Sequence, residues 1–170
     1  MDVFTAISER RSVRAYQGTE VDEEKINQII EAGRLAPSAA NRQEWKFIVV
    51  RNHETRQKLA SAANNQGFLG EAPVVIVCCA MESKVIMPCG QLAYTVDLSI
   101  ATAYMILAAY ELDLGTCWIG AFKEEEVKKV LDIPNHIRVV SLFPVGYPAQ
   151  NPAGRPRKSR EQILCFEKYV

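Results

Sequence analysis

The longest apolar stretch of the sequence, residues 91–114 (QLAYTVDLSIATAYMILAAYELDL), limits the folds that are open to this chain. Asp97 interrupts it and leaves thirteen uncharged residues from Leu98 to Tyr110. A bilayer-spanning helix needs about 20 apolar residues, so we do not expect this stretch to cross a membrane. We expect a helix that is buried on most of its faces. Its small residues would let another helix approach closely, from the same subunit or from a dimer partner: Ala101, Ala103, Ala108 and Ala109.

Helical and strand patterns alternate along the rest of the chain. Apolar residues recur at helical spacing in four segments: 2–10, 22–37, 53–63 and 123–133. Short β-branched runs have the composition of buried strands at three places: 45–50, 73–80 and 137–148. Residues 115–122 resemble a strand end or a loop, and no repeat or domain boundary is visible. The pattern predicts a single α+β or α/β domain over residues 1–170, with helices around a central sheet.

Composition argues against two classes of partner. The chain has 170 residues, 48% of them hydrophobic, which is enough for one domain with its own core. Twenty basic residues balance twenty acidic ones, so bulk attraction to nucleic acid or to an anionic membrane is not expected. The first residues, MDVFTAISERR, lack the basic start and apolar run of a signal peptide, and we expect a cytoplasmic protein.

The cysteines and histidines do not predict a metal site. The five cysteines are an odd number without any C-x-x-C pair, which favours reduced thiols over a disulfide framework or a zinc or iron–sulfur cage. Cys89 is expected to be an ordinary thiol rather than a redox group. His53 and His136 stand in polar, loop-like contexts, and both are expected at the surface.

Two clusters of arginines stand out on this neutral chain. The segment ERRSVRAY carries Arg10, Arg11 and Arg14 around Ser12, and a second cluster follows far along the sequence at Arg155 and Arg157. The first cluster alone could be a solvated charged turn. If the two clusters converge, they form a phosphate clamp, because the planar guanidinium donates paired hydrogen bonds to phosphate oxygens. Neither G-x-x-x-x-G-K-[ST] nor G-x-G-x-x-G occurs, so no P-loop or Rossmann turn holds that phosphate.

The segment APSAANRQEW, residues 36–45, is the second informative stretch. Pro37 ends a helix, and Ser38, Asn41 and Gln43 then offer hydroxyl and amide groups just before a strand. These can be ordinary turn residues. The alternative is a polar edge that hydrogen-bonds a planar heterocycle.

The order of these motifs resembles the nitroreductase family of FMN-dependent oxidoreductases. The family landmarks cover nearly the whole chain in five segments: RRSVRAY, APSAANRQEWKFIVV, LAAYELDLGTCWIGAF, FPVGYP and RPRKSREQI. Each motif alone is weak, but five in this order are specific. The resemblance implies an α+β fold of three layers, with a central mixed sheet flanked by helices. It also implies an intertwined homodimer with two FMN molecules at the subunit interface, and a C-terminal tail, about 150–170, that crosses to the partner subunit.

The resemblance also assigns the arginine clusters. Four residues match those that hold the FMN phosphate: Arg10, Ser12, Arg155 and Arg157. Arg11 continues the same loop, with mainly backbone contact. Arg14 matches the cation at the pyrimidine edge of the flavin, where reduction places negative charge on N1 and O2. No catalytic side chain and no metal are expected, since the chemistry takes place at N5 of the flavin.

The remaining cofactor contacts are likewise transferred by position. The loop that reaches the flavin from the second subunit corresponds to Pro37, Ser38 and Asn41. Ile119 and Gly120 match the pair whose backbone N–H groups face N5 and O4, where a glycine allows close approach. Gln66, in NNQGFL, is a weaker match to a polar contact beside the ribityl chain and the pyrimidine.

The implied activity is ping-pong transfer of two electrons from NADH or NADPH, through FMN, to nitroaromatics, quinones or similar electrophiles. Two alternatives remain open. One is a specialised family member, such as a reductive dehalogenase or a flavin-modifying enzyme, and the other is a non-enzymatic flavin-binding protein. The segment 81–90, MESKVIMPCG, is short compared with the substrate-covering region of longer family members. The substrate class is therefore not transferred.

Overall fold

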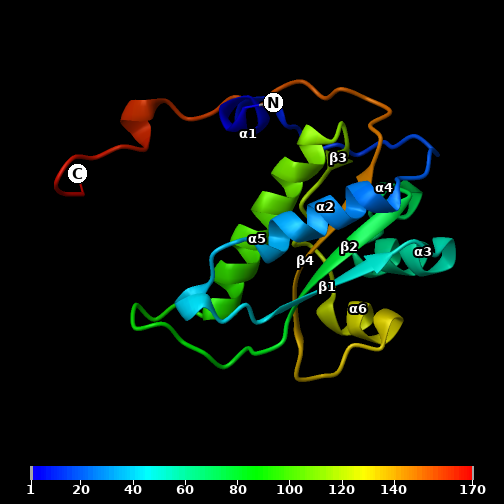
Figure 1. Ribbon diagram of the computed structural model, residues 1–170, viewed down its shortest axis with the longest axis horizontal. Helices are drawn as coiled ribbons and strands as arrows, with labels where there is room; N and C mark the ends of the chain where they lie inside the picture. The colour runs from blue at the N-terminus through cyan, green and yellow to red at the C-terminus, as the bar shows by residue number, and fades with distance from the viewer. Residues whose placement is uncertain (1, 170) are drawn as a thin grey trace.

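A computed structural model describes residues 2–169; Met1 and Val170, the ends of the predicted domain and tail, lie outside the described residues. Four strands form one sheet in the order β1-β2-β4-β3 (Figure 1). They are β1 (Trp45–Val50), β2 (Val74–Ala80), β3 (Gly115–Thr116) and β4 (Arg138–Gly146). These strands pair antiparallel. Among residues 2–169, parallel pairing is limited to the isolated bridge between Ser12 and Thr116, so the sheet is mixed only at this point.

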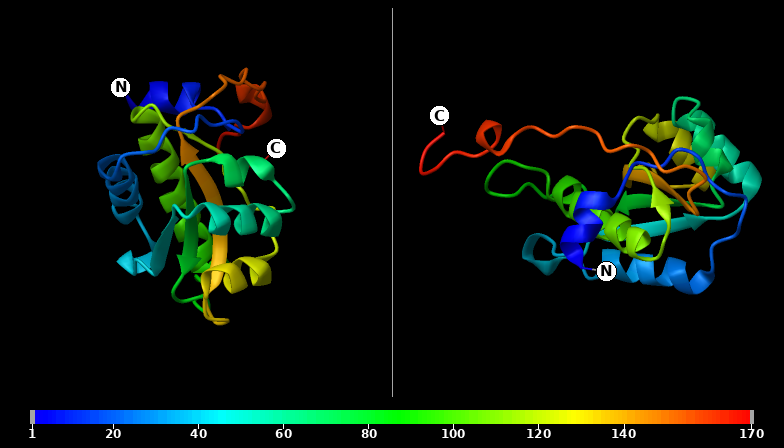
Figure 2. Two further views of the ribbon diagram at one scale, coloured as in Figure 1. Left: turned by 90° about the vertical axis from the view of Figure 1, so that its right-hand side faces the viewer. Right: turned by 90° about the horizontal axis from the view of Figure 1, so that it is seen from above.

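Helices cover both faces of the sheet, because both faces of β2 are apolar. Val74, Ile76 and Cys78 point into a core with α2 (Glu23–Arg34) and α5 (Ala93–Glu111). Val75 and Val77 point into a second core, which three helices cover: α3 (His53–Ala62), α4 (Gly67–Glu71) and α6 (Glu124–Leu131). Figure 2 shows the two helical layers on either side of the sheet. The predicted α+β fold of three layers is confirmed.

Helix α5 is the apolar helix that the sequence predicts, but it is longer than the uncharged stretch. It runs for 19 residues, from Ala93 to Glu111. By length and composition alone it is long and apolar enough to cross a membrane, and half of it is buried inside the chain. The inner face packs on the sheet through residues such as Leu98 and Met105, which are completely buried. The outer face carries an apolar stripe that the described chain leaves partly or fully exposed: Val96, Ile100, Ala103 and Leu107.

Two further apolar surfaces are exposed in the single chain. Helix α1 (Val3–Glu9) forms where the sequence predicts it, yet its side chains Val3 and Phe4 are 67% and 82% exposed. The tail leaves the body of the molecule after residue 150 (Figure 2) and contains a short 3₁₀ helix, η2 (Arg160–Gln162). Its apolar side chains, including Phe166 at 80% exposure, contact little of the chain.

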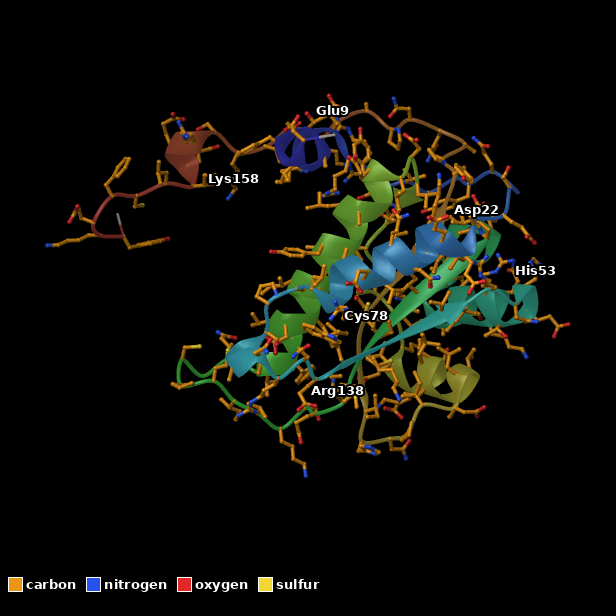
Figure 3. The ribbon with its side chains drawn as sticks, viewed as in Figure 1. Glu9, Asp22, His53, Cys78, Arg138 and Lys158 are labelled. Carbon is orange, nitrogen blue, oxygen red and sulfur yellow. The ribbon has the colours of Figure 1, made fainter. Side chains whose placement is uncertain are left out.

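Three of the cysteines are buried (Cys78, Cys79 and Cys117) and two are exposed (Cys89 and Cys165). Cys78 lies near the middle of the fold in Figure 3, whereas His53 lies at its periphery. Both histidines are exposed, as predicted. Within residues 2–169, no group of three or more His, Cys, Asp or Glu side chains could hold a metal ion.

Candidate functional site

The two arginine clusters line one cavity of about 270 Å³. The N-terminal segment contributes one wall and the start of the tail contributes the other. The lining residues are Ser8, Arg10, Arg11, Ser12, Arg14, Pro152, Ala153, Gly154, Arg155 and Arg157. The structure therefore brings together residues that are more than 140 positions apart in the sequence.

A short β-type pairing fixes the N-terminal wall to the sheet. Ser12 forms a parallel bridge with Thr116, and the Val13 N–H donates to the Thr116 carbonyl at 2.9 Å. The Val13 side chain is buried. Because side chains alternate along extended backbone, burial of Val13 turns Ser12 and Arg14 to the opposite side, toward the cavity.

The arginines of the cavity have different partners. The Arg11 guanidinium donates through Nη1 to the carbonyls of Ser8 and Arg10, at 2.8 and 2.9 Å, so it stiffens its own loop. Within residues 2–169, Arg10, Arg155 and Arg157 form no ion pair with a carboxylate. Cations gathered in one cavity without acidic partners repel one another and attract an anion. The cavity therefore suits a phosphate.

A second cavity, of about 400 Å³, adjoins the first, because Arg10, Ser12 and Arg157 line both. Its other walls are mainly apolar: Ile7 from α1, Ala103, Ile106 and Leu107 from α5, Thr116 at the end of β3, and Trp118 two residues later. The anion site is thus continuous with an apolar space of the kind that holds a planar ring. The sequence reasoning missed Trp118. The sequence signal that could have identified it is its position as a large aromatic residue directly before the Ile119–Gly120 pair.

Ile119 and Gly120 directly follow Trp118, which lines the second cavity, but they differ in their backbone contacts. The Ile119 N–H donates to the Leu142 carbonyl at 2.8 Å, and the Leu142 N–H donates back to the Ile119 carbonyl at 3.1 Å. Ile119 is buried, and its N–H group belongs to the sheet. Gly120 is exposed, and a Cβ built on it would meet only the Trp118 indole, at 3.9 Å. Gly120 is the member of the pair that a ligand can approach.

Arg14 and Gln66 lie on the α4 side of the arginine segment, which is the stretch ERRSVRAY at residues 9–16. The Arg14 guanidinium lies over the Phe68 ring, with its Cζ 5.9 Å from the ring centroid. Gln66 precedes α4, and its Nε2 donates to the carbonyls of Ala63 and Ala121, at 2.9 and 3.2 Å. In this structure the Gln66 amide therefore joins two backbone segments.

Two titratable groups lie behind the arginine segment. Burial raises the pKa of the Cys117 thiol, although the Arg14 charge and a hydrogen bond with Ser12 lower it in part. Burial also raises the pKa of Tyr16, whose hydroxyl donates to the Val13 carbonyl at 2.7 Å. Both groups are thus neutral near pH 7, and the positive charge of the cavity is not cancelled from behind.

The loop with Pro37, Ser38 and Asn41 is not part of these cavities. The Ala39 N–H donates to the Asp97 carboxylate at 2.9 Å, which ties the loop to the first part of α5. The second cavity adjoins Ile106 and Leu107, about ten residues or 15 Å further along the helix. Figure 1 shows the loop and α1 at opposite ends of α5. One subunit therefore does not bring this loop to its own arginine cavity.

The backbone of this loop is strained. Ala40, Asn41 and Gln43 have φ angles of 52°, 55° and 56°, in the left-handed region that non-glycine residues seldom adopt. The Gln43 N–H donates to the Ser38 hydroxyl at 3.0 Å, and this bond helps to hold the turn. Strain of this kind concentrates at functional sites.

Comparisons with known proteins find relatives that match most of this chain. A sequence model of the Nitroreductase family matches residues 7–67 and 60–147. A Methanothermobacter thermautotrophicus protein, provisionally named NADH dehydrogenase/NAD(P)H nitroreductase, is 39% identical over 159 residues, which cover 91% of this chain and 82% of that protein. The FMN reductase [NAD(P)H] of Bacillus subtilis is 30% identical over 99% of this chain and 75% of its own length.

Solved structures show the same fold. The Bacillus megaterium protein NfrA2 superposes with a TM-score of 0.92 at 28% identity and covers all of this chain and 76% of its own. A nitroreductase family protein of Clostridium novyi superposes with a TM-score of 0.84 at 32% identity, over 91% of this chain and 89% of its own. The matched segments include the arginine segment, the Ser38 loop and the Ile119–Gly120 pair. This chain therefore belongs to the nitroreductase family.

Proposed function

We propose that the protein is an FMN-dependent oxidoreductase that takes two electrons from NADH or NADPH and passes them to a small electrophile. The observation that carries the proposal is the cavity whose arginines form no ion pair with a carboxylate within residues 2–169, and which opens into an apolar space lined by Trp118. A flavin mononucleotide has the matching chemistry, with a phosphate at one end and a planar ring at the other. The names of relatives, which include FMN reductase and NADPH-flavin oxidoreductase, agree with it.

In this proposal Arg10, Ser12, Arg155 and Arg157 hold the FMN phosphate. Their guanidinium and hydroxyl donors match phosphate oxygens, and the Arg11 contacts keep the loop in place. The bound flavin would supply hydride acceptance and release at its N5 atom. The protein contributes position and charge, as expected where a cofactor carries the chemistry.

The ring end of the cofactor has two proposed contacts. The Arg14 guanidinium stabilises negative charge on the pyrimidine edge, because a fixed cation interacts most strongly with the charged, reduced state. The Gly120 N–H is proposed to donate near N5 and O4, since the Ile119 N–H is occupied by Leu142. No acid or base is assigned, and protons come from water.

We further propose that the working form is an intertwined homodimer. Three apolar surfaces of the single chain support this: the outer stripe of α5, the exposed side of α1 and the tail. A second subunit would cover them and would place its Pro37, Ser38 and Asn41 at the flavin held by the first. The tail, about 150–170, would cross to the partner. Sedimentation of the purified protein tests this part, and a monomer at micromolar concentration with FMN bound would contradict it.

The proposed acceptors are nitroaromatics, quinones and similar electrophiles, reduced by ping-pong kinetics in the cytoplasm. A single open flavin face cannot hold nicotinamide and acceptor together, so the two half-reactions alternate. Double-reciprocal plots should therefore give parallel lines.

One experiment tests the proposal as a whole. The purified protein, loaded with FMN, is titrated anaerobically with NADH and then NADPH while the flavin absorbance is recorded. Bleaching by either nicotinamide, followed by recovery of the colour on addition of a quinone, is the expected result. Failure to bind FMN, or a bound flavin that neither nicotinamide reduces, would overturn the proposal.

A further inference from the structure

The start of helix α4 touches two groups that the proposed function places at the flavin ring. Phe68, on the first turn of α4, lies beneath the Arg14 guanidinium at 5.9 Å. Gln66, just before the helix, donates to the Ala121 carbonyl at 3.2 Å, directly after Gly120. These contacts come from one short segment, and Phe68 also packs against the core cluster that contains Leu69.

Helix α4 is itself firmly held at its other end. Leu69 is completely buried in the core between the sheet and α3. The guanidinium of Arg56, only 9% exposed, donates from Nη1 to the Gly70 carbonyl at 2.7 Å and also to the Ala72 carbonyl. Its Nε donates to the Arg51 carbonyl at 3.2 Å. A buried cation thus satisfies the carbonyls at the end of α4, so the helix provides a rigid support.

Arg14 has few other restraints. It is exposed and forms no ion pair with a carboxylate within residues 2–169. Within the same residues its side chain donates one hydrogen bond, from Nη1 to the Ser12 carbonyl, and this bond is long, at 3.4 Å. The face of an aromatic ring attracts a guanidinium and limits its rotamers. The Phe68 ring is therefore the main restraint on where the Arg14 charge lies.

We propose that Phe68 is a positioning residue: supported by α4, its ring holds the Arg14 guanidinium at the pyrimidine edge of the flavin. This inference rests on the proposed function. This positioning affects the two oxidation states of the flavin differently, because the oxidised ring is neutral whereas the reduced ring carries negative charge. An oriented cation favours the reduced flavin over the oxidised one. Loss of the Phe68 ring should therefore weaken binding of reduced FMN more than binding of oxidised FMN.

The test compares the affinity of the full-length protein for oxidised FMN with its affinity for FMN reduced by dithionite. Phe68→Leu should lower the preference for reduced FMN about two- to fivefold, the size of an exposed cation–π contact. Phe68→Tyr keeps the aromatic face and should retain the preference. Phe47→Leu is the matched control, since Phe47 is also partly buried against a core cluster but stacks on Trp45, and no arginine within residues 2–169 lies over its ring.

Each outcome decides the matter. An unchanged preference in Phe68→Leu, or equal losses for both oxidation states, would show that Phe68 only fills space, and the proposal would fall. Equal changes in Phe68→Leu and Phe47→Leu would also overturn it. If Phe68→Leu does not fold, Phe68→Met fills a similar volume without an aromatic face and takes its place. Failure of the unmodified protein to bind FMN would instead refute the proposed function.

Discussion

Val13 lies directly against Gly115: a Cβ atom built on Gly115 would come within 2.8 Å of the Val13 Cγ2 and 2.9 Å of its Cβ. Because Val13 is β-branched, its side chain cannot rotate away from such a contact without losing its preferred rotamer. The absence of a side chain at Gly115 thus lets the arginine segment pair with Thr116. A residue on the sheet determines where Ser12 and Arg14 stand.

Gly115→Ala should therefore affect both stability and cofactor binding. We expect a loss of about 1–3 kcal/mol in the free energy of unfolding, as for other overpacked sites, together with weaker binding of FMN. Denaturant unfolding and a flavin titration measure the two effects. Gly18→Ala is the control, because a Cβ at Gly18 meets nothing within 4 Å. Normal FMN affinity in a destabilised Gly115→Ala protein would contradict the link between this packing and the site.

Arg157 lines both cavities, whereas Arg160, three residues later in η2, lines neither. Arg157→Ala should weaken FMN binding by about 2 kcal/mol, roughly 30-fold, since the phosphate loses a charged donor. Arg160→Ala should change it little. Fluorescence titration of FMN measures both variants, and equal losses would mean that the tail acts only through its general charge.

The Arg14→Gln variant tests the proposed contact with the flavin ring separately from the contacts with the phosphate. The rate of flavin reduction by the nicotinamide should fall about tenfold to a hundredfold, or roughly 1.4 to 2.7 kcal/mol of barrier, because charge on the reduced ring loses its partner. FMN occupancy should fall much less than in Arg157→Ala. Anaerobic stopped-flow absorbance gives the rate. An unchanged rate of flavin reduction in enzyme that is fully loaded with FMN would show that Arg14 does not interact with the flavin ring.

The Glu124 carboxylate joins α6 to β4, on the side of the sheet away from α5, and predicts a pH effect on stability. It accepts hydrogen bonds from Arg138 Nε and from the Val139 N–H, at 2.9 and 2.8 Å, and lies 3.5 Å from the buried Lys128 ammonium. Burial alone raises the pKa of Glu124, but these donors and charges outweigh it, and its pKa lies below the ordinary value of 4.5.

A lowered pKa in the folded state stabilises the fold above the unfolded-state pKa, and this contribution is lost as the pH falls through the folded-state value. Glu124→Gln should cost about 1–3 kcal/mol at pH 7, and its deficit relative to the unmodified protein should shrink below pH 4.5. Glu125→Gln should change little, because Glu125 is 71% exposed. Thermal melting across this pH range checks both. A deficit that stays constant at low pH would exclude the linkage.

Much of the fold could be predicted because its signals are local. The period of α2 and the β-branched runs of β1 and β2 follow from residues close in the chain. The full length of α5 could not be read in this way, since Asp97 looks like an interruption until Ala39 is seen to donate to it. The exposed side of α1 was equally hidden, because an apolar stripe does not say which surface covers it.

The candidate site likewise contains features that the sequence predicts and features that depend on long-range contacts. The arginine clusters could be paired by charge and by family resemblance, and the shared cavity of Arg10 and Arg157 agrees with that pairing. The hydrogen bonds from the Gln66 amide to the Ala121 carbonyl and from the Ile119 N–H to the Leu142 carbonyl could not be predicted, because each joins segments that are distant in the sequence. Trp118 and Phe68 were overlooked because a lone aromatic residue in a sequence resembles any core residue.

The central claim is that the cavity of Arg10, Ser12, Arg155 and Arg157 binds the phosphate of FMN. Riboflavin has the same ring and ribityl chain without the phosphate, so the difference between the two affinities isolates this cavity. Because each hydrogen bond to a charged group contributes about 1.5–3 kcal/mol, the unmodified protein should bind FMN at least about 100-fold more tightly than riboflavin. Arg157→Ala should narrow that ratio. Equal affinities for FMN and riboflavin in the unmodified protein would contradict the account.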